Sequence, residues 1–324
     1  MNSAGNKSVT HLVVGDESQG QRLDNFLIRH CKGVPKSHLY RILRSGEVRV
    51  NSRRVDGTYR LCINDTIRIP PIRVAERAHT AIDQVAKQRV DLPILFEDDA
   101  MLVIDKPEGI AVHGGSGVSF GVIEALRHQR PEAKFLELAH RLDRETSGVL
   151  LIGKKRLALT ELHDMFREHG AGADKRYLVL VKGRWMNNTQ HVRVPLLKYL
   201  TDEGERRVAV NESGKPSHTV FRLLARWPGM SLLEAQLKTG RTHQIRVHLA
   251  HLGFPILGDE KYGDFALNKS MRSAGLKRMG LHAWKMSFRH PLTSEAMTCV
   301  APLPESIASY IASVDSSGHR EFAT

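Results

Sequence analysis

Cysteine is scarce in this chain, with three residues among 324. They lie far apart in the sequence, at Cys31, Cys62 and Cys299, and none belongs to a Cys-x-x-Cys pair. This usage is typical of a reducing compartment, where disulfides are rare. It excludes a disulfide framework and a zinc site built from cysteines.

Long apolar runs are missing as well. No stretch approaches the roughly 18–20 apolar residues that span a bilayer. The first residues, Met1–Thr10, are polar and lack the apolar core of a signal peptide. We therefore expect a soluble, cytoplasmic protein that has no membrane partner.

Three common active-site motifs are also absent. The glycine-rich segment 114–117 is not followed by the Gly-Lys-Ser/Thr of a phosphate-binding loop. Three histidines between 243 and 251 lack the His-Glu-x-x-His spacing of a helical zinc site and have no acidic partner. Ser147 is not framed as Gly-x-Ser-x-Gly, the nucleophile motif of many hydrolases. We therefore expect no nucleotide cofactor and no metal, and a serine hydrolase is disfavoured.

Basic residues, in contrast, are present in excess. Lysine and arginine total 48 and aspartate and glutamate 35, which gives a net charge of +13 and a pI of about 9.8. Such an excess is typical of proteins that bind a polyanion, with nucleic acid the simplest partner for this chain. The length and the 41% of hydrophobic residues allow two domains with real cores.

Forty residues near the N-terminus hold more than half of this charge excess. Between 21 and 60 the basic residues are Arg22, Arg29, Lys32, Lys36, Arg41, Arg44, Arg49, Arg53, Arg54 and Arg60, and the acidic ones are Asp24, Glu47 and Asp56. Ten minus three gives +7, which predicts contacts with nucleic-acid phosphates, although a solvated charged surface is the alternative. We expect RNA contacts from Arg22, Lys36, Arg41, Arg44, Arg53 and Arg54.

The same stretch predicts a small folded module. Apolar residues at helical spacing over 23–27 indicate a helix, and Ser37 is a plausible N-cap for a second one. Alternating residues around Val48 and Ile67 indicate strands. The motifs at 22–27, 37–43 and 46–51 resemble the S4 domain, a small α/β RNA-binding module. We expect this domain over 21–75, after a flexible N-terminus at 1–20.

A larger domain is expected over 93–314, after a linker at 76–92 and before a flexible tail at 315–324. Short apolar segments predict strands near 94–96, 101–104, 177–181, 217–227 and 230–238. A helix over 156–169 is expected to turn Leu157, Leu162, Met165 and Phe166 toward one side. Strands and helices do not alternate regularly, so an α+β domain is favoured over a doubly wound one.

One loop concentrates polar side chains beside a buried strand. His140, Arg141 and Asp143 lie within four residues, and the apolar segment 149–152 follows shortly after them. A carboxylate flanked by cations on a well-anchored loop is a candidate for chemistry. The alternative is an exposed, salt-bridged turn.

A second segment supplies a possible partner. A strand is expected to end at Thr239-Gly240, before a helix with Ile245, Leu249 and Leu252 on its apolar face. Arg246 lies off that face near the start of the helix, where it can pair with a carboxylate from elsewhere. The alternative is a surface arginine.

These segments together resemble the RluA family of pseudouridine synthases. The family signature His-Arg-Leu-Asp-x-x-Thr-Ser-Gly is present at 140–148 without departure. Further matches are Lys175-Arg176-Tyr177, the segments 240–248 and 257–263, and Leu281-His282-Ala283. The resemblance covers about 90–315 and implies a mixed, mainly antiparallel central sheet.

The resemblance also implies a reaction, in which uracil is detached from C1′ of its ribose, turned, and rejoined through C5. Asp143 is then the catalytic aspartate, which either attacks the sugar or removes a proton from it. Arg246 is its charge partner, and Tyr177 stacks on the base. The target base must be flipped out of the RNA. The remaining implied roles are RNA contact or base flipping for His140, Arg141, Arg241 and His243, and pocket lining for Ile245 and Leu281.

The resemblance leaves the substrate less defined. Residues 112–121 are similar to a subgroup that acts on large-subunit (23S) ribosomal RNA, and this RNA is the expected partner. A synthase acting on tRNA or another RNA is an alternative. So are a non-catalytic RNA-binding or ribosome assembly protein and an RNA hydrolase that uses Asp143 and His140. No cofactor, no metal and no obligate protein partner are expected, and the chain is expected to be a monomer.

Overall fold

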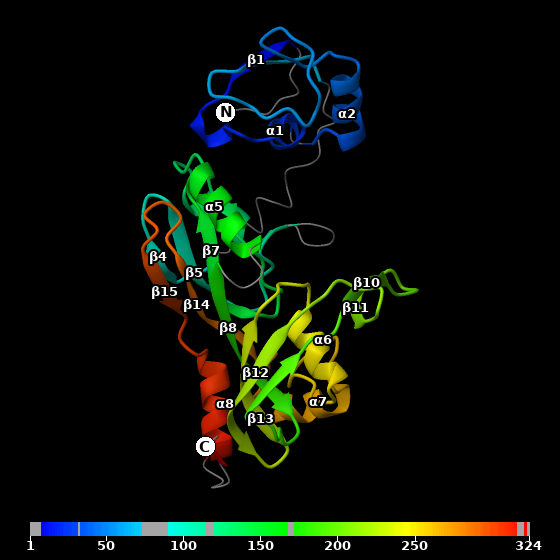
Figure 1. Cartoon of the computed structure of the whole chain (residues 1–324), viewed down its shortest axis with the longest axis vertical. Helices are drawn as coiled ribbons and strands as arrows, with labels where there is room; N and C mark the ends of the chain where they lie inside the picture. The colour runs from blue at the N-terminus through cyan, green and yellow to red at the C-terminus, as the bar shows by residue number, and fades with distance from the viewer. Residues whose placement is uncertain are drawn as a thin grey trace. The chain divides into compact units, whose positions relative to one another are not determined.

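The computed structural model describes residues 8–31, 33–72, 90–114, 120–167, 172–315 and 321–322 (Figure 1). Several expectations lie wholly or partly outside these residues: the start of the N-terminus, Lys32, most of the linker, glycines 115 and 117, the end of the helix at 156–169, and most of the tail. The chain divides into two compact units, residues 1–88 with 131–135, and the remainder.

In its described residues the N-terminal unit contains a three-stranded antiparallel sheet and two short α-helices. Its elements are β1 (Thr10–Val13), the 3-10 helix η1 (Asp16–Ser18), α1 (Leu23–His30), α2 (Lys36–Arg44), β2 (Arg49–Val50) and β3 (Thr66–Ile69). The strand order is β1-β3-β2. The apolar residues at helical spacing, including Leu23, Phe26 and Leu27, are buried in one core with the strand residues. This packing exposes the polar faces of both helices.

Two expectations about this unit are wrong. The N-terminus is not flexible from Thr10 onward, because Thr10–Val13 pairs with β3. Ser37 does not cap α2, because the helix starts at Lys36, two residues earlier than expected, with Pro35 at the N-cap, and no side chain caps it. The Pro35 carbonyl instead accepts the N–H groups of His38 and Leu39.

The larger unit is built on a mixed, mainly antiparallel sheet, which confirms the predicted α+β class (Figure 1). Its strands are β4 (Ile94–Glu97), β5 (Met101–Lys106), β6 (Glu137–Leu138), β7 (Ser147–Gly153), β8 (Ala173–Lys182), β9 (Thr189–Val192), β12 (Thr219–Trp227), β13 (Met230–Leu237), β14 (Leu281–Arg289), β15 (Ala296–Val300) and β16 (Glu321–Phe322). The main order is β16-β12-β13-β8-β14-β7-β5-β4. Within the described ranges β7 and β14 form the parallel pair. The expected flexible tail is wrong at Glu321–Phe322, which pairs with β12.

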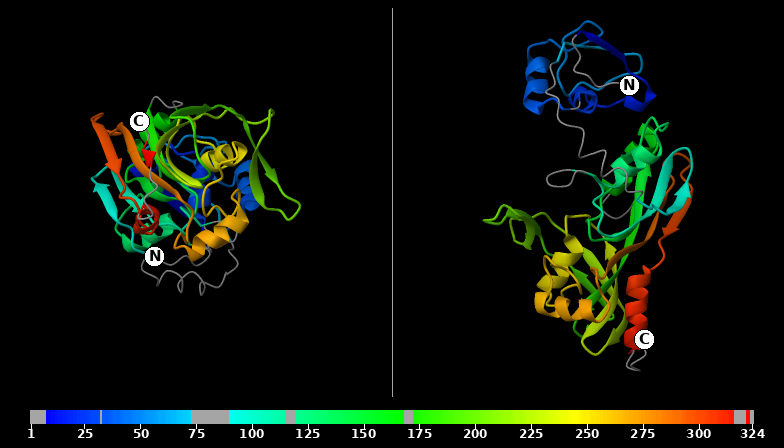
Figure 2. Two further views of the ribbon diagram at one scale, coloured as in Figure 1. Left: turned by 90° about the horizontal axis from the view of Figure 1, so that it is seen from below. Right: turned by 180° about the vertical axis from the view of Figure 1, so that it is seen from behind.

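A second, two-stranded sheet stands away from the central sheet. It is the hairpin of β10 (Leu196–Leu200) and β11 (Arg206–Val210), which projects from the unit in both views of Figure 2. Its base packs through Leu196 and Val208 on Val247 of a neighbouring helix. The hairpin is therefore anchored beside that helix.

Five helices flank the sheets of this unit within the described residues. They are α4 (Val122–Gln129), α5 (Arg156–Arg167), α6 (Gln244–His251), α7 (Phe265–Ser273) and α8 (Glu305–Asp315). In α5 the residues buried toward β7 are Ala158, Leu159 and Leu162. The expectation for Leu157 is wrong, since its side chain is 62% exposed. At about 100° per residue, Leu157 lies about 140° around the helix from Leu162.

Gly148 explains why the loop signature ends in glycine. Its φ is +113°, in a region that side chains disfavour. A Cβ at this position would lie 2.2 Å from the carbonyl oxygen of Ala283 on β14. The close approach of β7 and β14 therefore needs glycine here, and it fixes the end of the loop that carries Asp143.

Candidate active site

Asp143 lies on a loop between β6 and β7 whose backbone is fixed by hydrogen bonds. The buried Lys106 Nζ donates hydrogen bonds to the carbonyls of Pro107, Ile110 and Arg144, at 2.7, 2.8 and 3.2 Å. The backbone N–H of Thr146 bonds to the carbonyl of Asp143 at 3.2 Å. Burial lowers the pKa of Lys106 to about 8. The loop is thus fixed through its backbone, which leaves the Asp143 side chain available.

A buried network holds the other end of this loop. Arg278 Nη2 donates to Ser147 Oγ at 2.6 Å, and Ser147 Oγ lies 2.8 Å from His282 Nδ1. Arg278 Nε also pairs with Glu108 at 2.7 Å. Burial lowers the pKa of His282 to about 4, so the ring is neutral and accepts the serine proton. Ser147 therefore has a positioning role between β7 and β14.

His140 does not partner Ser147. Its Nε2 accepts the backbone N–H of Leu151 at 3.1 Å, and burial lowers its pKa to about 3. A nitrogen used in this way cannot also serve as a general base. This arrangement argues against the hydrolase alternative.

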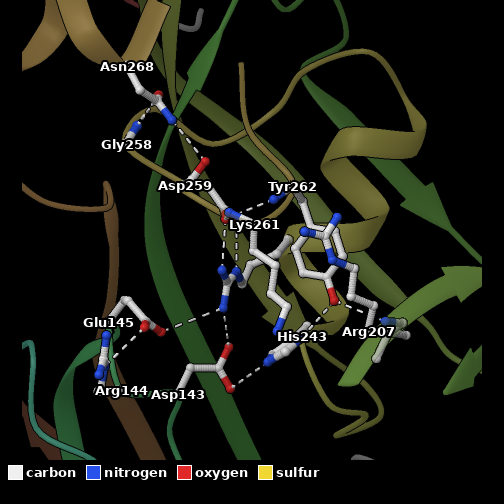
Figure 3. A network of polar contacts seen from close by, with 12 residues as sticks. Asp143, Arg144, Glu145, Arg207, His243, Gly258, Asp259, Lys261, Tyr262 and Asn268 are labelled. Carbon is white, nitrogen blue, oxygen red and sulfur yellow. Dashed lines mark hydrogen bonds and ion pairs between the residues drawn. The ribbon is translucent and has the colours of Figure 1, made fainter. Parts of the chain in front are cut away.

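Arg246 links two carboxylates from distant parts of the chain, Asp143 and Asp259, which are labelled in Figure 3. Its Nε and Nη2 each donate to one oxygen of Asp259 at 2.7 Å. Its Nη1 donates to Asp143 Oδ2 at 3.1 Å and lies 3.8 Å from Glu145. Arg246 is 4% exposed and Asp259 1%, whereas the Asp143 side chain is 26% exposed. The bidentate pair with Asp259 fixes the guanidinium, and its remaining nitrogen faces Asp143.

The charges of this pair are mutually stabilised. Burial alone would raise the pKa of Asp259, but hydrogen bonds and charge from Arg246 lower it. Burial alone would lower the pKa of Arg246, but Asp259 and then Asp143 raise it. Two further N–H groups, from Lys261 and Tyr262, bond to Asp259 at 2.8 and 3.0 Å. Asp259 is therefore a satisfied buried anion.

Helix α6 differs from the expected amphipathic helix. Every residue from Gln244 to Leu249 is buried, including the polar ones, and Leu252 follows the helix as its C-cap. Arg246 is accordingly not a surface arginine. The buried polar side chains have partners: Gln244 bonds to Thr239 and Thr219, and His248 to Ser217. Hydrogen bonds to other segments thus satisfy the polar side chains that an amphipathic helix would expose to solvent.

Tyr177 lies on β8 and is 7% exposed. Burial, and then the charge of Asp143, raise the pKa of its hydroxyl. Lys175 lies two residues earlier, on the same face of the strand. Its Nζ sits 3.8 Å over the ring of Phe166, and burial lowers its pKa to about 8.

Asp143, Arg246 and Tyr177 line one cavity of about 780 Å³. It brings together every candidate that the sequence placed in the larger unit: His140, Arg141, Asp143, Tyr177, Arg241, His243, Ile245, Arg246 and Leu281. Arg141 is exposed at this cavity, and no described residue bonds to its guanidinium. Arg241 Nε instead donates to the carbonyl of Pro216 at 3.1 Å.

The basic candidates of the N-terminal unit form a separate group. Arg22 pairs with Asp24 at 2.7 Å, and Arg54 bonds to the carbonyl of Arg44. Lys36 and Arg53 are exposed and form no side-chain bond with any described residue. Within the described residues, Lys36 and Arg53 therefore remain open to a ligand.

Sequence reasoning missed several residues around Asp143. Asp259, Tyr262 and Lys175 all belong to segments that were recognised, yet none was assigned a role. Asp259 follows a glycine in a polar turn, which alone does not distinguish a buried anion from a surface one. Its pairing with Arg246 depends on tertiary structure.

Neither a metal site nor a membrane span is found in the described part of the chain. No group of three or more His, Cys, Asp or Glu side chains there could hold a metal ion. No helix there is long and apolar enough to cross a bilayer.

Comparisons with known proteins agree with this architecture. A family model described as RNA pseudouridylate synthase matches residues 100–251. The chain is 51% identical over 300 residues to ribosomal large subunit pseudouridine synthase C of Pasteurella multocida, covering 92% of this chain and 91% of that protein. It is 50% identical over 304 residues to the protein of that name from Escherichia coli, covering 93% and 95%.

Solved structures show the same fold. Human RNA pseudouridylate synthase domain containing 1 is 25% identical, with a TM-score of 0.56, and the match covers 68% of this chain and 87% of that one. Human RNA pseudouridylate synthase domain containing 4 is 23% identical with a TM-score of 0.59, covering 76% and 100%. The sequence identities and coverage establish the relationship: the chain belongs to the RluA family of RNA pseudouridine synthases.

Proposed function

We propose that this pseudouridine synthase isomerises uridine in large-subunit ribosomal RNA. The observation that carries the proposal is the Asp143–Arg246 pair, set in a cavity that Tyr177 also lines. The RNA class is supported by relatives named ribosomal large subunit pseudouridine synthase C that are about half identical over nearly the whole chain.

In the proposed reaction Asp143 acts on the ribose of a flipped uridine. The carboxylate attacks C1′ or removes a proton from the sugar, and in either route the N1–C1′ electron pair goes to N1. The uracil then turns and C5 bonds to C1′, which breaks the Asp143–C1′ bond in the first route or returns the proton from Asp143 to the sugar in the second. C5 then loses its proton and N1 gains one, so the net reaction is an isomerisation. Arg246 holds the carboxylate in place, and Tyr177 offers a face on which the free base turns without fixing its edge.

The remaining cavity residues are proposed to handle the RNA. Arg141, exposed and unbonded, is placed to fill the space that the flipped base leaves. His140 and Arg241 are proposed to line the path of the strand, and Ile245 and Leu281 to pack against the base. His243 is considered separately below.

The N-terminal unit is proposed to be an S4-type RNA-binding domain. It presents basic side chains on a small fold, and Lys36 and Arg53 have no described anionic partner. We further propose that the protein acts as a monomer without an obligate partner. The proposed substrate implies a cytoplasmic location.

A Lys36→Gln/Arg53→Gln double variant tests this RNA-binding role. Each lost phosphate contact should reduce the slope of log affinity against log salt by about 0.7–0.9, so the pair should reduce it by about 1.4–1.8. Binding to large-subunit RNA measured over a salt series checks this. Lys269→Gln/Lys277→Gln removes the same net charge from the larger unit and serves as the control. An unchanged slope in Lys36→Gln/Arg53→Gln would show that these basic side chains are solvated and do not contact RNA.

The RNA class is tested by incubating the protein with unmodified large-subunit RNA, small-subunit RNA and tRNA in parallel. Mapping pseudouridine in each should show defined new sites in the large-subunit RNA alone. New sites confined to tRNA or small-subunit RNA would contradict the proposed substrate and leave the family assignment intact.

A further inference from the structure

His243 lies between Asp143 and Tyr262 (Figure 3). Its Nε2 is 3.8 Å from Asp143 Oδ1, and its Nδ1 is 2.8 Å from the hydroxyl of Tyr262. The residue is the N-cap of α6 and has a left-handed backbone, with φ at +51°. Few non-glycine residues adopt this conformation, and the surrounding contacts hold His243 in it.

The hydrogen bonds of Tyr262 specify which imidazole nitrogen carries the proton. The backbone N–H of Val208 donates to the Tyr262 oxygen at 3.0 Å. The phenol proton then needs an acceptor, and within the described residues His243 Nδ1 is the one at hydrogen-bond distance. If Tyr262 donates to Nδ1, the proton of a neutral imidazole is on Nε2, which faces Asp143.

The surroundings keep this imidazole neutral and this phenol protonated. The charged groups that act on His243 are Asp143, Asp259, Arg246 and Lys261. Burial lowers the pKa of His243, Asp143 opposes this, and Arg246 and Lys261 lower it further. Burial raises the pKa of Tyr262 to about 12.

Tyr262 is itself fixed from two sides. Its ring packs with the apolar cluster of Leu196, Val208 and Val247, at the base of the β10–β11 hairpin. It also contacts the His243 ring edge-on, with the centroids 5.5 Å apart. The hairpin strand β11 thus places the hydroxyl that orients the histidine.

We propose that His243 is a positioning residue for Asp143, with its Nε2–H directed at Oδ1 while Arg246 holds Oδ2. Tyr262 sets the tautomer, so that β11, Tyr262 and His243 together fix the plane of the carboxylate. The 3.8 Å between Nε2 and Oδ1 is longer than a hydrogen bond, and a small turn of the carboxylate closes it to hydrogen-bond length. The inference rests on the proposed catalytic role of Asp143, and it replaces the expectation that His243 binds RNA.

Three variants test this assignment in a steady-state assay on large-subunit RNA. His243→Ala should lower kcat about 10²-fold with little change in RNA affinity, because the reacting group loses its orientation. His243→Gln, whose amide retains a donor, should recover about tenfold of that loss. Tyr262→Phe should lower kcat about tenfold, because without the phenol donor on Nδ1 the imidazole can carry its proton there and lose the Nε2–H that faces Asp143.

His251→Gln and Tyr199→Phe are the matched controls, since both side chains are exposed and outside the cavity. Melting curves show whether each variant is folded. A raised Kd with unchanged kcat in His243→Ala would overturn the proposal and make His243 an RNA contact. An unchanged kcat in Tyr262→Phe would overturn the tautomer assignment. If the wild-type protein formed no pseudouridine in the same assay, the proposed function itself would fail.

Discussion

An Asp143→Asn variant is expected to bind RNA as tightly as the wild-type protein and to form pseudouridine at least roughly 10³-fold more slowly. The substitution preserves the size of the side chain, and its amide oxygen can still accept the bond from Arg246 Nη1. It removes the negative charge that both routes through the sugar need. The substitution leaves the fold and the RNA-binding surface unchanged, so the loss of activity should appear in kcat.

Single-turnover kinetics with saturating protein separate this loss from any change in binding. Asp99→Asn is the matched control, because its side chain is 97% exposed and lies outside the cavity. The control should retain the wild-type rate. Near wild-type turnover by Asp143→Asn would assign the chemistry to another residue.

An Arg246→Met variant is expected to lose both activity and stability. The methionine fills much of the space but leaves Asp259 buried without its cation. Breaking a buried ion pair in this way typically costs about 3–5 kcal/mol. Activity should fall as well, because Asp143 loses the donor on Oδ2.

Urea unfolding followed by tryptophan fluorescence measures this effect, since all three tryptophans lie in the larger unit. Arg222→Met is the control: Arg222 is 45% exposed and pairs with Glu234 at 3.4 Å, so its loss should cost within about 1 kcal/mol. Arg246→Lys should be intermediate, because an ammonium cannot form the two parallel bonds to Asp259. Equal midpoints for Arg246→Met and Arg222→Met would contradict the account of the buried pair.

Much of the secondary structure followed from local sequence. Short apolar segments predicted the strands β12 and β13, and two further ones on either side of Asp98 predicted β4 and β5, because these patterns need only neighbouring residues. The parallel pairing of β7 with β14 could not be predicted this way. It joins Ser147 to His282, far along the chain, and depends on the close approach at Gly148.

The candidate site likewise has one part that the sequence predicted and another that depends on tertiary structure. The sequence pointed to Asp143 and Arg246, and the structure places their side chains 3.1 Å apart across 103 residues. Their roles were implied by motif resemblance, and they remain proposals. Asp259 was missed because a buried anion and a surface aspartate look alike in sequence. Leu157 and Ser37 were misplaced because helical phase and helix starts are uncertain by a residue or two.

The most direct test follows one uridine through the reaction. Unmodified large-subunit RNA is incubated with the wild-type protein or with Asp143→Asn, and each position is then read for uridine, pseudouridine and strand breaks. The account predicts that the wild-type protein converts specific uridines to pseudouridine, with no strand breaks and no free uracil, and that the variant converts none. Strand cleavage, release of uracil, or equal conversion by the variant would contradict it.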